Sequence, residues 1–177
     1  LTANPSTYLY SFKASLGTPG QELNILVSTE SSDFIVADVS GNCKGDGCGG
    51  IQNKYDPKAS NTSKDYDSYK DTRPIWWISN AVGNRYFDSF SLGNITNANM
   101  SIASMINYSI PDNSWSYDGS LGLNLESKNC PIDMLLDNNL LLNASFSLYL
   151  RDPKLSGSVL VLGGIDEKYA ASPFSYT

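Results

Sequence analysis

Alternation of apolar and polar residues dominates the pattern of this chain. From Tyr8 to Leu16 an apolar side chain recurs at every second position, with Ser11, Lys13 and Ser15 between them. A period of two places one set of side chains on each face of an extended segment. The pattern therefore predicts a half-buried β-strand, followed by a turn at Gly17–Gly20.

Further strands follow from the same reasoning, at Leu23–Val27, Phe34–Ala37, Met100–Asn107, Phe146–Leu150 and Val159–Leu162. Pro74–Asn80 and Arg85–Leu92 predict a hairpin with Gly83 near its tip. Asn42–Gly50 predicts a glycine-rich loop, and the polar residues 53–72 predict surface turns. The apolar spacing in Pro131–Leu142 predicts the one helix.

Many short strands with one helix predict an all-β sandwich or a stack of folded sheets. The chain has 177 residues. That length fits one domain, which buries roughly 70% of the surface of its unfolded chain. No internal repeat or linker divides the sequence, so we expect a single domain over residues 1–177.

Composition and charge narrow the class of protein. The charged fraction is 17% and the formal net charge is −6. An acidic surface repels phosphate, so we expect no nucleic-acid partner. No apolar run reaches the roughly 20 residues of a membrane helix. Histidine is absent, which removes Ser-His and Cys-His catalysis and the usual zinc sites. We therefore expect no metal and no cofactor.

Three cysteines occur, at positions 43, 48 and 130. A disulfide between Cys43 and Cys48 would close a short glycine-rich loop and would imply an oxidising compartment. Two free surface thiols are the alternative. Cys130 is left over, whether free, buried or paired with a segment outside these residues.

Five Asn-X-Ser/Thr triplets are candidate glycosylation sites. They begin at Asn61, Asn94, Asn99, Asn107 and Asn143. Together with the cysteine pair they favour the secretory route, which places the protein outside the cell or in the lysosomal or endomembrane lumen.

Five fragments follow one another along the chain: Tyr10–Gln21, Leu26–Val36, Asp118–Leu123, Phe146–Leu150 and Ser156–Asp166. In this order they resemble the amino-terminal lobe of pepsin-like aspartic peptidases, a fold of folded antiparallel sheets with one or two short helices. The Cys43–Cys48 pair stands where that family has a small disulfide loop. The resemblance implies the pepsin-like fold and a single lobe, with a second lobe absent from this chain.

In that family each lobe contributes an Asp-Thr-Gly loop, and the two aspartates share a proton and activate a water. In this chain Ser28 stands at the aspartate position, Thr29 is kept, and Glu30 stands at the glycine position. A serine hydroxyl is not ionised at neutral or acid pH, so it cannot act as the base. The resemblance therefore implies the fold without the proteolysis.

Neither remaining group near the loop replaces the aspartate well. Residues 28 and 30 of an extended segment point to the same side. The Glu30 carboxylate nevertheless begins two residues away, on a longer stem, and the simpler expectation is that it turns to solvent. Ser28 lacks a histidine to activate it as a nucleophile.

The resemblance also implies a binding cleft. Its residues would be Ser28, Thr29, Glu30, Ser31, Trp76, Trp77 and Ser120. Trp76 takes the place of the tyrosine on the family's flap, and Ile35 that of its tryptophan partner. The two tryptophans would either form an aromatic wall for a ligand or pack into the hairpin and core.

Three functions follow. The first is a catalytically inactive, secreted peptidase-like domain that binds a peptide or protein. The second is an aspartic endopeptidase that is active only with a second lobe. The third is an inhibitor or structural interaction protein. An isolated lobe would expose an apolar face, so a second lobe or a homodimer partner is expected to cover it.

Overall fold

The structure is a computed structural model, and it describes residues 1–71, 78–111, 113–124, 130–170 and 172. Strands dominate this part of the chain, which has one α-helix, α1 (Pro131–Asp137). The strands are β1 (Thr2–Ala3), β2 (Tyr10–Leu16), β3 (Gln21–Ser28), β4 (Phe34–Lys44), β5 (Lys64–Asp71), β6 (Ser79–Leu92), β7 (Ile95–Ser109), β8 (Gly119–Gly122), β9 (Phe146–Tyr149) and β10 (Val159–Leu162). Short 3₁₀ helices lie at Asp46–Gly50, Pro57–Ala59 and Glu167–Tyr169.

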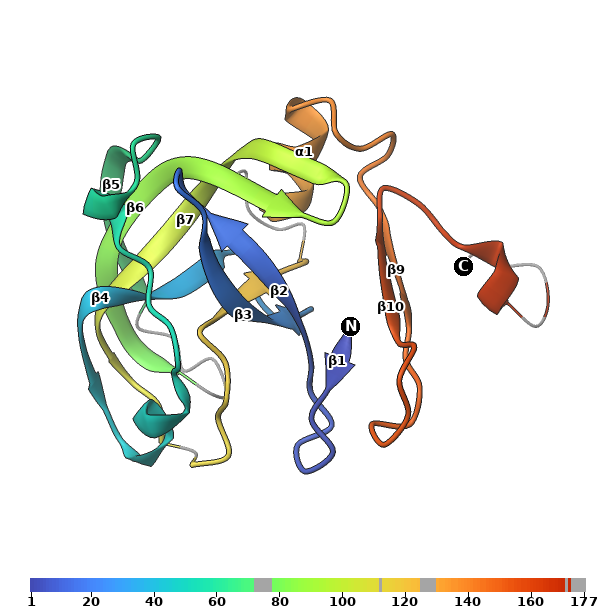
Figure 1. Ribbon diagram of the computed structural model, residues 1–177, viewed down its shortest axis with the longest axis horizontal. Coiled ribbons are helices and arrows are strands. Elements are labelled where there is room, and N and C mark those ends of the chain that lie inside the picture. The colour runs from blue at the N-terminus through green and yellow to red at the C-terminus, as the bar shows by residue number, and fades with distance from the viewer. Residues whose placement is uncertain (72–77, 112, 125–129, 171, 173–177) are drawn as a thin grey trace.

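Eight strands form one sheet in the order β1-β2-β3-β8-β4-β7-β6-β5. A further pairing of Ser15 and Leu16 in β2 with Ser91 and Phe90 in β6 closes the sheet on itself. The pairs β3–β8 and β4–β7 are parallel. Strands β9 and β10 form a separate antiparallel hairpin beside this sheet, as Figure 1 shows. The all-β fold predicted from the sequence is confirmed. The expectation of antiparallel sheets is corrected, because the two parallel pairs make the large sheet mixed.

Two hydrophobic clusters lie on opposite faces of the strands because neighbouring residues of a strand point to opposite sides. In β4, Val36 belongs to the first cluster and Ile35 to the second. In β3 the corresponding pair is Ile25 and Leu26. The first cluster also holds Cys130, which is fully buried and forms no disulfide. The second cluster carries the candidate site described below.

The long strands correct several predictions. Residues 53–72 were expected to be surface turns, but Lys64–Asp71 form β5. Gly83 does not lie at a hairpin tip, because it is in the middle of strand β6. Glycine is needed there because a Cβ would collide with the Ser104 carbonyl. Strand β4 continues to Lys44, into the predicted glycine-rich loop.

Smaller differences concern the ends of elements. The helix ends at Asp137, five residues before the predicted end, and Cys130 caps its first turn by accepting a hydrogen bond from Asp133 N. Tyr8, the first residue of the strand predicted at Tyr8–Leu16, lies outside β2. It has a positive φ of 58° and is 68% exposed. The first segment of the predicted hairpin falls largely on residues 72–77, outside the described residues.

The predicted disulfide is confirmed, and it joins Cys43 in β4 to Cys48 in the following 3₁₀ helix. Replacing both cysteines with serine should lower the free energy of unfolding by about 2 kcal/mol, because the cross-link limits the unfolded chain. Urea denaturation with and without a reductant measures this loss. The reductant should destabilise the wild type but not the double variant. Equal stability of the two proteins without reductant would contradict the prediction.

Candidate functional site

The candidate site lies where β3 ends. Strand β8 lies between β3 and β4, parallel to the first and antiparallel to the second. Ser28, the last residue of β3, pairs with Gly122 at the end of β8. Because alternate residues share a face, Ser28 lies on the same face as Leu26 of the second cluster. Residues 29–33 then connect β3 to β4 across this junction.

Backbone hydrogen bonds hold this connection closely against β8. Leu123 N donates to Ser28 O at 2.7 Å, and Gly122 N donates to Asp33 O at 2.9 Å. A side chain at Gly122 would collide with the Ser31 carbonyl, so the close approach requires glycine. The loop after β3 is therefore fixed by main-chain contacts to a second, distant segment.

The side chains of the loop divide into buried and exposed groups. Ser28 is 6% exposed and Ser31 8%, whereas Thr29 and Glu30 are exposed. The Ser28 hydroxyl accepts a hydrogen bond from Glu30 N at 3.3 Å. A hydroxyl, not a carboxylate, thus occupies the buried position at the end of β3, and the expectation that Glu30 turns to solvent agrees with its exposure.

A buried ion pair that the sequence did not predict lies beside the loop. Arg85 Nη2, in β6, lies 2.7 Å from Asp33 Oδ1, and their side chains are 16% and 10% exposed. The guanidinium also lies 4.8 Å from the centre of the Tyr69 ring. Asp33 N in turn donates to the Ser31 hydroxyl. The pair ties the end of the loop to β6 across 52 residues of sequence.

Asp118, the residue directly before β8, forms a second anchor at the opposite end of that strand from Gly122. Its side chain is 2% exposed. Oδ1 accepts hydrogen bonds from Gln52 N and Asn53 N, and Oδ2 accepts one from Asn24 N, each at 2.8 Å. Asn53 Nδ2 donates a fourth at 3.2 Å. This carboxylate has a structural role, since its oxygens connect Asn24 of β3 and residues 52–53 to the start of β8.

The structure brings together only part of the predicted cleft. Ser28, Ser31 and Ser120 lie in adjacent segments, and Ser120 is fully buried, so it lies beneath the surface. The Ser120 hydroxyl has no hydrogen-bond partner among the described residues. Trp76 and Trp77 lie outside the described residues. Asp33, Arg85 and Tyr69 were missed because they lie in a loop and on two different strands, so they form no local motif.

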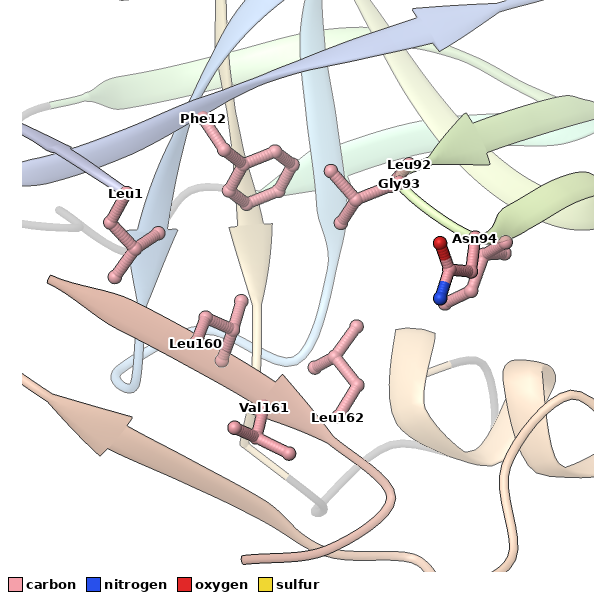
Figure 2. Close-up of a pocket in the computed structure, with 9 residues that line it drawn as sticks. Leu1, Phe12, Leu92, Gly93, Asn94, Leu160, Val161 and Leu162 are labelled. Carbon is pink, nitrogen blue, oxygen red and sulfur yellow. The ribbon is translucent and has the colours of Figure 1, made fainter. Parts of the chain in front are cut away.

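A separate apolar hollow of about 430 Å³ lies between the large sheet and the β9–β10 hairpin. Figure 2 shows Phe12 and Leu92 on one side and Leu160 and Leu162 on the other, with Asn94 near the edge. None of the described residues that line this hollow belongs to β3 or β8. It marks where the hairpin packs incompletely on the first hydrophobic cluster.

Two features are absent from the residues that the structure describes. No helix there is long and apolar enough to cross a membrane. No cluster of three or more carboxylate, cysteine or histidine residues there could hold a metal ion.

All five asparagines of the candidate glycosylation triplets are exposed. They lie on several different elements: Asn94 at the β6–β7 turn, Asn99 and Asn107 in β7, and Asn61 and Asn143 in loops. Exposure makes each one accessible to a glycan without disturbing the two hydrophobic clusters.

A family model of eukaryotic aspartyl proteases matches residues 9–177. The chain belongs to the eukaryotic aspartyl protease family. Secreted aspartic protease 4 of Candida albicans is 30% identical over 184 residues, which cover 92% of this chain and 41% of the relative. Chymosin of Ovis aries is 31% identical over 168 residues, covering 90% and 42%. The chain thus spans less than half the length of these relatives of the aspartyl protease family.

Proposed function

We propose that this chain is an aspartic-peptidase-like domain that does not cleave peptide bonds by itself and binds a peptide or protein segment over the β3–β8 junction. The observation that carries the proposal is the serine at the end of β3. Ser28 occupies the position that the family resemblance gives to the catalytic aspartate, and its hydroxyl cannot act as a carboxylate base at acid pH.

The neighbouring carboxylates support the same conclusion. Glu30 is exposed at the loop. Asp33 is paired with Arg85, and Asp118 accepts hydrogen bonds from three backbone amides. A carboxylate that activates water needs a free oxygen in hydrogen-bond reach of that water. These two buried carboxylates are held in structural contacts, so we propose a binding role for the site.

We also propose that the protein follows the secretory route, to the outside of the cell or a lysosomal or endomembrane lumen. The disulfide supports this location, because such bonds persist in oxidising compartments. Five of the relatives are named secreted aspartic proteases, and the five exposed triplets are available for glycosylation.

A second candidate is an endopeptidase that is active with a second lobe or a second copy of this chain. Two observations favour it. The chain spans 41% to 46% of its relatives. Apolar side chains are also exposed around the β9–β10 hairpin, with Leu150, Leu155 and Ile165 between 40% and 51% exposed. A partner lobe would cover such a surface. An inhibitor or structural partner is the third candidate, and it would share the binding surface.

The purified chain should not cleave denatured globin at acid pH, and pepstatin should change nothing, because a serine and not a carboxylate lies at the buried end of β3. Peptide release followed by mass spectrometry measures this. In a longer gene product that carries a second lobe, Ser28→Asp with Glu30→Gly should create activity that pepstatin blocks.

Glu30→Gln tests whether the Glu30 carboxylate acts in place of the missing aspartate. Cleavage by the wild-type chain that pepstatin inhibits would overturn the proposal of an inactive domain. Loss of that cleavage in Glu30→Gln would then assign the chemistry to Glu30.

A further inference from the structure

A polar hollow of about 630 Å³ opens at the surface beside β5, β6 and β7, away from the β3–β8 junction. Its lining residues include Asn61, Thr62, Lys64, Ser89, Asn97 and Asn99. All of its lining residues within the described part of the chain are polar. A volume of this size is within the range of sites that enclose small ligands.

Two of the lining asparagines, Asn61 and Asn99, begin glycosylation triplets. Asn99 is the better placed of the two, because it lies within β7 and pairs with Ser89 of β6. Its neighbours Ala98 and Met100 are buried in the first hydrophobic cluster. The alternation of the strand therefore directs the Asn99 side chain outward, onto the hollow.

The hollow offers hydrogen-bond donors that protein contacts leave available. The Asn97 side-chain oxygen accepts from the Ser89 hydroxyl at 3.1 Å, and its amide nitrogen keeps two donors. The ammonium of Lys64 supplies three more. Thr62, by contrast, is committed, since its hydroxyl lies 2.6 Å from Asp88 Oδ1. Such an arrangement suits a ligand rich in hydroxyl groups.

A free sugar would bind weakly here, because the lining residues that the structure describes provide no aromatic surface on which a sugar ring could stack. A sugar attached to Asn99 differs in one respect. Its tether maintains an effective concentration of the order of millimolar, so weak contacts are enough to hold it.

We propose that the first sugars of an N-linked glycan on Asn99 lie in this hollow, where Lys64 and Asn97 donate hydrogen bonds to their hydroxyl groups. The inference rests on the secretory route proposed above. The host enzyme supplies the covalent step. Asn99 Nδ2 forms a bond to C1 of the sugar, the bond from C1 to a lipid-pyrophosphate donor breaks, and the amide proton leaves with the pyrophosphate.

A glycan held in the hollow is shielded from enzymes that remove it. The chain is secreted from a eukaryotic host, digested in its native state with an endoglycosidase, and analysed site by site with mass spectrometry. Release from Asn99 should be at least about tenfold slower than from Asn107 or Asn143, a ratio worth about 1.4 kcal/mol. After denaturation the rates should become equal.

Two variants test the contacts themselves. Lys64→Ala and Asn97→Gly remove the proposed donors, and glycine keeps the positive φ of 54° at position 97. Both should accelerate release from Asn99 and leave release from Asn143 unchanged. Lys58→Ala, which removes a lysine outside the hollow, should have no effect.

The outcomes separate this inference from the proposal on which it rests. Equal native release from Asn99 and Asn143, or an empty Asn99 beside an occupied Asn143, would overturn the seated glycan and leave the secretory route standing. Absence of glycan from all five triplets of the secreted chain would also overturn only the seated glycan, whereas native protein found in the cytosol without glycan would overturn both.

Discussion

Asp118→Ala should lower the free energy of unfolding by roughly 4 kcal/mol, on the scale of 1.5–3 kcal/mol for each hydrogen bond to a charged group. The carboxylate accepts from the backbone amides of Asn24, Gln52 and Asn53, and it is 2% exposed. Alanine leaves those donors without their partner. Since domains are commonly stable by about 5–15 kcal/mol, this one change removes a large share. Urea denaturation of the purified variant measures the loss.

Two further variants separate the hydrogen bonds from the mere loss of a charge. Asp118→Asn keeps the shape but turns an amide nitrogen toward backbone donors, so we expect an intermediate loss of about 2 kcal/mol. Glu22→Ala removes an exposed carboxylate that pairs with Lys13, and it should change stability little because solvent screens such pairs. If Asp118→Ala were no more harmful than Glu22→Ala, the anchoring role would be wrong.

The strands that the sequence predicted well are those with one buried face. In β2 the alternation of Phe12, Ala14 and Leu16 with polar residues follows the burial directly. Strand β5 was missed for the opposite reason. It lies at the edge of the sheet, and in Lys64–Lys70 only Tyr69 is buried, so the segment has no apolar period. Gly83 was assigned to a turn, although its role is to let the Ser104 carbonyl approach β6.

The parts of the candidate site that were predicted also differ from those that were missed. The family resemblance identified Ser28–Ser31 and the Asp118–Leu123 segment because both are continuous in sequence. The contacts that hold them are not continuous. Asp118 binds residues 24, 52 and 53, and Asp33 pairs with Arg85. Polar residues that meet across the sheet leave no local period, so only the structure identifies their partners.

The buried pair of Asp33 and Arg85 leads to the second large effect. Arg85→Met should lower the free energy of unfolding by about 3–5 kcal/mol, because it leaves the Asp33 carboxylate without its counter-charge in a poorly solvated place. Their side chains are only 10% and 16% exposed, so water compensates little. The loop from Ser28 to Asp33 should also loosen from β6, which amide hydrogen exchange in residues 29–33 would report.

A double variant decides whether the charge is the cause. Adding Asp33→Asn to Arg85→Met removes the uncompensated carboxylate, and about 2 kcal/mol of the loss should return, as expected for residues in direct contact. If the two single losses simply added, the pair would contribute nothing beyond packing. Recovery would instead mean that the ion pair holds the loop beside Ser28 in place. An ordered loop at this position is what the proposed binding role for the site requires.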